Sequence, residues 1–186
     1  MNITREAATD LLHKYITKEN MINHCLASEQ VLRALAARLG HDADTWGLAG
    51  LLHDIDVEIT QADPLTHGQV AIGILREAGV DEEVIEAISL HNEESTEIPR
   101  SKPLHHALAA GETITGLIVA TTLVYPEKKL EVVKTKSVVK RMKEKAFAAS
   151  VKRESIMECE RLGLGIDEFA ALSIEAMKSI APRMGL

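Results

Sequence analysis

The sequence has few aromatic residues, few cysteines and no long apolar segment, and each absence narrows the kind of protein that it can encode. Only five of its 186 residues are Phe, Tyr or Trp, so the core must consist of Leu, Ile, Val and Ala, which favours helices over β-sandwiches or barrels. The two cysteines, Cys25 and Cys159, show no pairing pattern, which indicates a reducing compartment rather than a disulfide framework. We find no strand-like alternation and no internal repeat.

The chain also lacks the segments that direct a protein to or through a membrane. Its longest apolar run, residues 117–125, is interrupted by threonines and is far shorter than the roughly 20 residues that a spanning helix needs. The N-terminus has no basic stretch followed by an apolar one, as a secretory signal would. We therefore expect a soluble, cytoplasmic protein.

Acidic residues outnumber basic ones, but the two kinds of charge are unevenly distributed along the chain. The net charge is −7, yet residues 128–153 contain ten Lys and Arg against two Glu, a local charge of +8 that leaves −15 for the remainder. A protein this acidic is a poor general binder of duplex nucleic acid, whereas a local basic strip could hold one phosphorylated small molecule. A solvated helical face is an alternative of equal weight.

Capping residues and glycines predict the helix boundaries. Thr4 can cap the first helix, Gly40 stops the second, and Asp63-Pro64 is typical of a helix start. The predicted helices cover about residues 4–16, 19–39, 44–56, 63–79, 81–91, 103–124, 150–162 and 167–183.

The third of these helices is the most informative part of the chain. Residues 46–52 carry no charge and predict a buried helix, which ends on the titratable side chains of His53, Asp54, Asp56 and Glu58. Unpaired buried charge is costly, so these groups need water, partners or a metal. Imidazole and carboxylate together suit divalent zinc, iron, manganese or nickel, and a carboxylate can bridge two ions.

Further polar residues lie on the apolar faces of other predicted helices. His24, His67 and His91 each share a stripe with apolar side chains, and Glu112 interrupts the apolar run 107–124. Taken singly, an inward histidine is more often a hydrogen-bonded core residue than a ligand. Together these residues would be a costly set of burials without a shared reason, and a metal centre between facing helices supplies one.

The order His24, His53-Asp54, His67, His91 and a late carboxylate resembles the HD superfamily of metal-dependent phosphohydrolases, which are all-helical. Its HDIG-type subgroup is resembled most closely, through residues 51–56, 66–68, 90–92, 115–118 and 147–154. The resemblance covers residues 20–186. It implies an all-α, single-domain helical bundle with a metal-binding core at about 20–125 and a C-terminal extension at about 126–186.

The resemblance also implies a ligand set for one or two divalent ions, which could be Mn, Fe, Ni, Zn or Mg. His24, His53, Asp54 and Glu112 would hold the first ion, and Asp54 would bridge to a second held by His67 and His91. Alternatively, this second pair orients the substrate phosphate or stabilises the site by hydrogen bonds. Glu112 stands where the superfamily usually has Asp, and Asn92 stands where some two-metal members have His. His105 is expected as a reserve ligand or a partner of Glu112.

The activity implied is hydrolysis of a nucleotide or another small phosphate ester by water that the metal activates, since a metal lowers the pKa of bound water from about 15.7 towards 7. Asp54 is assigned to catalysis as well as to the metal, and Asp56 and Glu58 are candidate proton carriers. Candidate phosphate contacts are Lys136, Lys140 and Arg153. The alternatives are an HD-like di-iron oxygenase and a non-catalytic metal or nucleotide sensor. No membrane or duplex nucleic acid partner is expected, and the substrate and the oligomeric state stay open.

Overall fold

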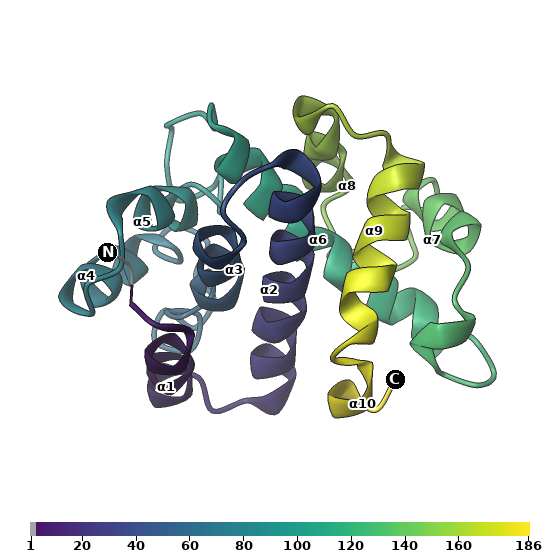
Figure 1. The fold of residues 1–186 in the computed structure, drawn as a ribbon, viewed down its shortest axis with the longest axis horizontal. Coiled ribbons are helices and arrows are strands. Elements are labelled where there is room, and N and C mark those ends of the chain that lie inside the picture. The colour runs from purple at the N-terminus through teal and green to yellow at the C-terminus, as the bar shows by residue number, and fades with distance from the viewer. Residues whose placement is uncertain (1–2) are drawn as a thin grey trace.

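Residues 3–186, which the computed structural model describes, form α-helices and two short 3₁₀-helices and contain no strand (Figure 1). The predicted all-α fold class is therefore confirmed. The α-helices are α1 (Arg5–Tyr15), α2 (Glu19–Leu39), α3 (Ala43–Leu52), α4 (Gln69–Glu77), α5 (Glu82–Ser89), α6 (Pro103–Leu123), α7 (Thr135–Met142), α8 (Arg153–Ile156), α9 (Ile166–Lys178) and α10 (Ala181–Met184). The 3₁₀-helices are η1 (Leu130–Val132) and η2 (Met157–Leu162).

The long helix α2 is the centre of the bundle. It packs against α3 on one side, α9 on the other, and α6, which passes behind it in the view of Figure 1. Glycines permit two of these close approaches: a Cβ added at Gly50 of α3 would lie 2.6 Å from the Ser28 carbonyl oxygen, and one at Gly111 of α6 would lie 2.5 Å from Leu32 Cδ2. Buried residues from Ala8 to Ala181 form one continuous hydrophobic cluster.

Several predicted boundaries are confirmed. The Thr4 side chain caps α1 by accepting a hydrogen bond from the Ala7 N–H at 3.2 Å. Helix α2 ends at Gly40, whose φ of 78° is the left-handed conformation that glycine adopts readily. Pro103 occupies the first turn of α6.

The boundaries predicted around residues 53–68 are wrong. Helix α3 ends at Leu52 rather than near residue 56, and α4 begins at Gln69 rather than at Asp63. The segment between them is a series of tight turns, and Gly68, at φ 89°, separates the last turn from α4. The Asp63 carboxylate accepts the Leu65 N–H at 3.0 Å and so caps a turn instead of a helix.

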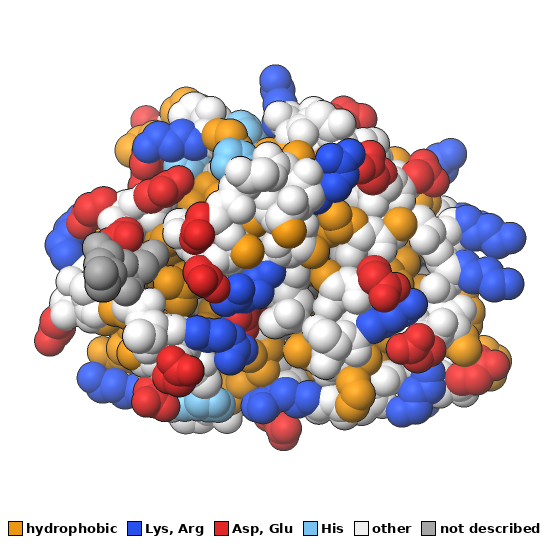
Figure 2. Space-filling model, in the orientation of Figure 1, with side chains coloured by type: hydrophobic (Ala, Val, Ile, Leu, Met, Phe, Trp, Pro, Cys, Tyr) orange, Lys and Arg blue, Asp and Glu red, His pale blue; other side chains and the backbone are white. Residues whose placement is uncertain are grey.

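The C-terminal helices are shorter than predicted. The helix expected over 150–162 is divided into α8 and η2, and the helix expected over 167–183 is divided into α9 and α10. Figure 2 shows acidic and basic side chains interspersed on the visible face, with Lys and Arg projecting at the edge where Figure 1 places α7. None of the helices within residues 3–186 combines the length and the apolar character that a membrane crossing requires. The domain division predicted near residue 125 stays a prediction.

Candidate metal centre

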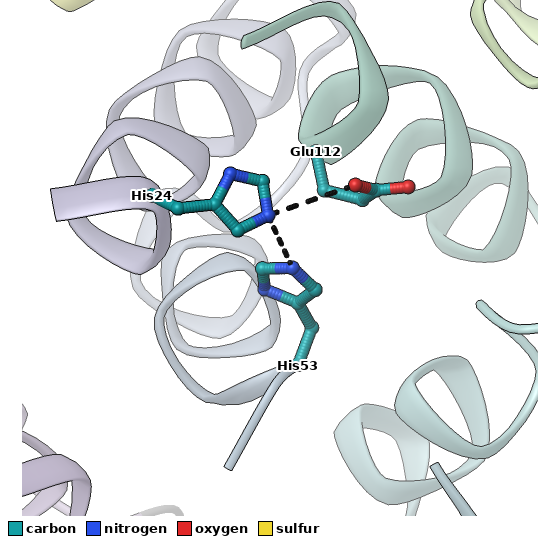
Figure 3. A group of neighbouring side chains, drawn as sticks. All are labelled: His24, His53 and Glu112. Atoms are coloured by element: carbon teal, nitrogen blue, oxygen red, sulfur yellow. Dashed lines mark hydrogen bonds and ion pairs between the residues drawn. The ribbon is translucent and has the colours of Figure 1, made fainter. Parts of the chain in front are cut away.

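Histidines and carboxylates from five separate segments converge on one place in the bundle. His24 comes from α2, His53-Asp54 from the end of α3, His67 from the turn before α4, His91 from just beyond α5, and Glu112 from α6. They form two groups, His24 with His53 and Glu112, and Asp54 with His67 and His91, and the ligand atoms in each group lie within 4.8 Å of one another. Figure 3 shows the first group, with both imidazoles and the carboxylate directed at a common point.

The Asp54 carboxylate lies between the two groups. Its Oδ2 atom is 3.6 Å from His24 Nε2, and its Oδ1 atom is 3.4 Å from His53 Nε2. The same Oδ1 atom is 3.1 Å from His67 Nε2 and 3.6 Å from His91 Nε2. One carboxylate therefore faces all four imidazoles, as a ligand that bridges two ions would.

Hydrogen bonds determine which ring nitrogen of each imidazole carries the proton. The His53 Nδ1–H donates to the Gly50 carbonyl at 2.9 Å, and the His91 Nδ1–H donates to the Ile88 carbonyl at 2.6 Å, because a carbonyl oxygen can only accept. The Thr115 hydroxyl donates to the Glu112 carbonyl at 2.6 Å, so it accepts the His24 Nδ1–H at 3.0 Å. In the neutral form, each of these rings presents an unprotonated Nε2 to the centre.

His67 is oriented by a carboxylate instead. Its Nδ1–H donates to Asp56 Oδ1 at 2.8 Å, while Asp56 Oδ2 accepts the N–H groups of Gly68 and Ala71, both at 2.9 Å. Burial lowers the pKa of His67, but hydrogen bonds to Asp54 and Asp56 outweigh it and raise that pKa to about 10. The two carboxylates therefore favour positive charge at this position, whether a proton or a metal ion, and the His67 Nε2 faces Asp54.

The spacing of the imidazoles fits a metal ion. The Nε2 atoms of His24 and His53 are 3.1 Å apart, and so are those of His67 and His91. Burial lowers the pKa of His53 to about 3, so this ring is neutral at pH 7 and its lone pair faces another nitrogen. Two nitrogens at this distance can both lie about 2.0–2.1 Å from one ion, the usual zinc–imidazole distance. Neutral imidazole with carboxylate is a donor set that divalent transition metals accept.

The two carboxylates of the centre, the buried Asp54 and the partly buried Glu112, differ in their surroundings. Burial raises the pKa of Asp54, but the neighbouring His53, His67 and His91 outweigh it and hold that pKa well below its usual range. Burial raises the pKa of Glu112, whose Oε2 lies 3.7 Å from His24 Nε2 and whose Oε1 accepts the Thr113 hydroxyl. A cation between Glu112 and His24 would favour the ionised form of this carboxyl.

A cavity of about 300 Å³ lies over the centre. The centre itself supplies part of its wall, and the rest includes Asn92, Arg100, Thr113, Gly116 and Lys152. The Lys152 ammonium is half-exposed and lies 2.6 Å from a Glu94 carboxylate oxygen. The partly buried Arg100 donates to the carbonyls of Leu90 and His91 at 2.9 and 2.7 Å and pairs with Glu158. The cavity therefore has cationic side chains in its wall.

The cations predicted from the basic segment lie elsewhere. Lys136, Lys140 and Arg153 are not in the wall of this cavity. Helix α7 buries Val138 and exposes Lys136 and Lys140, and the Arg153 guanidinium donates to backbone carbonyls, including those of Ala148 and Val151 at 2.7 Å each. Sequence reasoning missed Lys152 and Arg100, because neither belongs to a periodic pattern. The one sequence feature that pointed to Lys152 was its position beside Arg153 in a segment that resembles the HDIG subgroup.

Asp56 and Glu58 do not have the surroundings expected of proton carriers. Asp56 is fully buried and both its oxygens are used in orienting His67 and the start of α4. The Glu58 carboxylate accepts hydrogen bonds from the Thr17 and Lys18 N–H groups at 3.0 and 2.9 Å, so it fixes the turn before α2.

His105 does not contact Glu112 either. It lies two helical turns earlier on α6, about 10 Å along the axis. Its buried Nδ1 accepts the N–H groups of Ser101 and Lys102 at 3.3 and 3.4 Å, and its Nε2 lies 3.8 Å from Glu86. His105 therefore caps the beginning of α6, and the contact expected between it and Glu112 is corrected.

Comparison with known proteins agrees with this architecture. The family model described as HD domain matches residues 21–144, so the chain belongs to the HD domain family. Domains of this family bind divalent metals, and the two His and carboxylate groups are candidate ligands for them. The HDIG subgroup stays a prediction.

Curated relatives share only part of their length with this chain. The chain is 32% identical over 105 residues to Ribonuclease Y 2 of Levilactobacillus brevis, which covers 55% of this chain and 19% of that protein. It is 33% identical over 86 residues to a tRNA (cytidine(56)-2'-O)-methyltransferase of Thermoplasma volcanium. This alignment covers 46% of this chain and 25% of that protein. It is 37% identical over 84 residues to an uncharacterized protein of Methanocaldococcus jannaschii, 42% and 48% of the respective lengths.

Proposed function

We propose that the chain is a metal-dependent phosphohydrolase that acts on a small phosphate ester. The observation that carries this proposal is the convergence of four imidazole Nε2 atoms on the Asp54 carboxylate, beneath a cavity with Lys152 and Arg100 in its wall. Membership of the HD domain family supports it. The names of the relatives include both a ribonuclease and a methyltransferase, so they do not identify the substrate.

In this proposal His24, His53, Asp54 and Glu112 hold one ion. A divalent cation there supplies Lewis-acid charge for the phosphoryl oxygens and lowers the pKa of a water molecule from about 15.7 towards 7. Lys152 binds a peripheral phosphate oxygen, since its ammonium is half-exposed beside the cavity. Arg100 positions His91 by donating to its carbonyl at 2.7 Å.

Asp54, His67 and His91 hold a second ion in the same proposal. The alternative, in which His67 and His91 orient the phosphate directly, requires a proton on an Nε2 atom that can be donated to the phosphate, because their Nδ1 atoms already bond Asp56 and the Ile88 carbonyl. Asn92 stands where some two-metal family members have a ligand, but its amide donates to the carbonyls of Pro64 and His67 at 2.7 and 3.0 Å. This side chain therefore holds the His67 turn in place, and the second ion depends on three ligands from the chain.

The test is metal analysis of the purified protein and of Asp54→Asn, a nearly isosteric change, combined with phosphate release in added Mn, Mg, Ni, Zn or Fe. Asp10→Asn is the matched control, because Asp10 is exposed on α1 and does not line the cavity over the metal centre. We expect one or two ions per chain and phosphate release in the wild type and the control, and loss of both in Asp54→Asn. Metal binding without phosphate release would contradict the hydrolase. In that case, two irons with the Mössbauer signature of a coupled pair would favour the oxygenase. Binding of a redox-silent metal would instead favour the sensor.

Lys152 has its own test, with Lys140→Ala as the control from the same basic segment. Lys152→Ala should raise KM for a phosphate ester about tenfold, the effect of losing one charge-assisted hydrogen bond of roughly 1.4 kcal/mol. Lys140→Ala should leave KM unchanged, because Lys140 is exposed and lies outside the cavity wall. An unchanged KM in Lys152→Ala would exclude Lys152 from phosphate binding.

A further inference from the structure

A second cavity adjoins the metal centre. Its volume is about 410 Å³, and it lies between the first half of α2, the second half of α6 and the chain around α10. His24 and Gly116 line both this cavity and the one over the metal centre. The two cavities therefore adjoin at these residues, and we call the second one the α2–α6 groove.

The α2–α6 groove differs chemically from the cavity over the metal centre. Among residues 3–186, no Lys, Arg, Asp or Glu lines the groove, whereas Lys152, Arg100 and Glu93 line the metal cavity. The apolar side chains of the groove are Ala27, Val119, Ala120, Leu123, Met184 and Leu186. A ligand in this groove gains by burying uncharged, apolar surface.

The outer end of the groove leaves apolar surface in contact with water. Leu123 is 49% exposed although it lines the groove, and the adjacent Val124 is 54% exposed. Few large apolar side chains are this exposed in the described chain. A concave surface of this kind, joined to a polar reactive centre, is typical of a small-molecule site with one apolar end.

We propose that the α2–α6 groove binds the apolar alcohol portion of the phosphate ester whose phosphoryl group lies at the metal centre. This inference rests on the proposed function and names its substrate class: monoesters of uncharged, apolar alcohols. In this proposal the ligand passes His24 and Gly116, which line both cavities, so that its phosphate lies beneath Lys152 and its alcohol portion is directed towards Leu123.

The test compares methyl, propyl and pentyl phosphate, which have the same reacting group and differ only in apolar length. Each methylene that the groove buries should raise kcat/KM about fourfold, since a buried methylene contributes about 0.8 kcal/mol. A diethylene glycol monophosphate of similar length to pentyl phosphate should show no such gain, because its ether and hydroxyl oxygens lose hydration. Equal kcat/KM across the series would overturn the proposal.

Two variants and a control locate the effect. Ala120→Phe fills the groove, and Leu123→Gln keeps the side-chain volume but makes the wall polar; each should lower the ratio of kcat/KM for pentyl to methyl phosphate at least tenfold. Ala37→Phe is the control, because Ala37 is exposed on α2 and lines neither cavity, and it should retain the wild-type ratio. Melting curves establish that each variant is folded. Retention of the ratio in both groove variants would overturn the proposal.

A binding measurement separates failure of this inference from failure of the proposed hydrolase. The probe is 4-fluorobenzyl alcohol, which has no phosphate, observed by ¹⁹F NMR with the wild-type protein. Line broadening that Ala120→Phe abolishes and Ala37→Phe retains would support the groove even if no ester is hydrolysed. Absence of broadening in the wild type, or equal broadening in all three proteins, would overturn it.

Discussion

Gly50→Ala should destabilise the protein, although alanine is the better helix former. In the interior of α3, the change to alanine contributes about 1 kcal/mol of helix propensity. However, a Cβ at this position would lie 2.6 Å from the Ser28 carbonyl oxygen, 2.7 Å from its carbon and 2.8 Å from the Glu29 nitrogen. These atoms are backbone of α2, which cannot rotate away as a side chain can.

The magnitude follows from these distances. Cβ contacts below 3.0 Å essentially do not occur, so α3 must move away from α2 by at least 0.4 Å at this point. Overpacking of this kind costs about 3 kcal/mol, the upper part of its usual range, because backbone opposes backbone. After the propensity gain, the net loss is about 2 kcal/mol, which corresponds to a decrease in Tm of roughly 4–8 °C for a chain of this length.

The same displacement should weaken metal binding, since the Gly50 carbonyl accepts the His53 Nδ1–H at 2.9 Å and Asp54 is the next residue. The assays are thermal unfolding by circular dichroism and titration with a competing chelator.

Two glycine variants serve as controls. Gly73→Ala in α4 has no atom within 4 Å of the new Cβ and should be stabilised by about 1 kcal/mol, and Gly47→Ala meets only the flexible Arg33 side chain. If Gly50→Ala is as stable as Gly73→Ala, the argument from close packing of α2 and α3 is refuted.

Three further predictions concern buried and capping carboxylates. Asp56→Asn should lower metal affinity about 10–100-fold, as loss of the group that orients a ligand histidine does, and chelator competition at unchanged affinity would refute the role of Asp56 in orienting His67. Glu29→Ala should cost about 2 kcal/mol in denaturant unfolding, because the buried Glu29 carboxylate pairs with the half-exposed Arg5 at 2.5 Å and the partly exposed Arg33 at 3.0 Å. Arg38→Ala breaks an exposed pair and should cost below about 1 kcal/mol, and equal losses would contradict this ranking. Hydrogen bonds from Lys18 and Thr17 lower the pKa of Glu58, so its contribution to stability is complete above the unfolded pKa of about 4.3 and is lost as the pH falls through the lower folded pKa. The Tm of Glu58→Gln should therefore be below that of the wild type at pH 7 and approach it only as the pH falls below the lowered pKa of the folded protein, and a difference independent of pH would refute this account.

Short-range features of the sequence were sufficient to predict much of the fold. Thr4, Gly40 and Pro103 marked helix ends correctly, because capping and helix termination depend on a few neighbouring residues. Helical periodicity placed His24 on an inward face, and the structure brings it within 3.1 Å of His53. The assignment of the converging histidines and carboxylates as metal ligands stays a prediction.

Long-range contacts decided what local patterns could not. Asp63-Pro64 has the local chemistry of a helix start, yet α4 begins only at residue 69. Gly68 has a φ of 89°, which is not helical, and the Asp56 carboxylate accepts the N–H groups of Gly68 and Ala71 at the start of α4. Asp56 could be identified as the partner of His67 only in the folded chain.

The sequence by itself determined the helical class, most helix ends and the residues that have metal-binding chemistry, since these depend on composition and on neighbours along the chain. Only the tertiary structure decided which cations lie beside that chemistry. Lys152 and Arg153 are adjacent, yet Lys152 lines the metal cavity while Arg153 donates to carbonyls of the preceding loop. The direction of a charged side chain depends on partners supplied by distant segments, which no local pattern specifies.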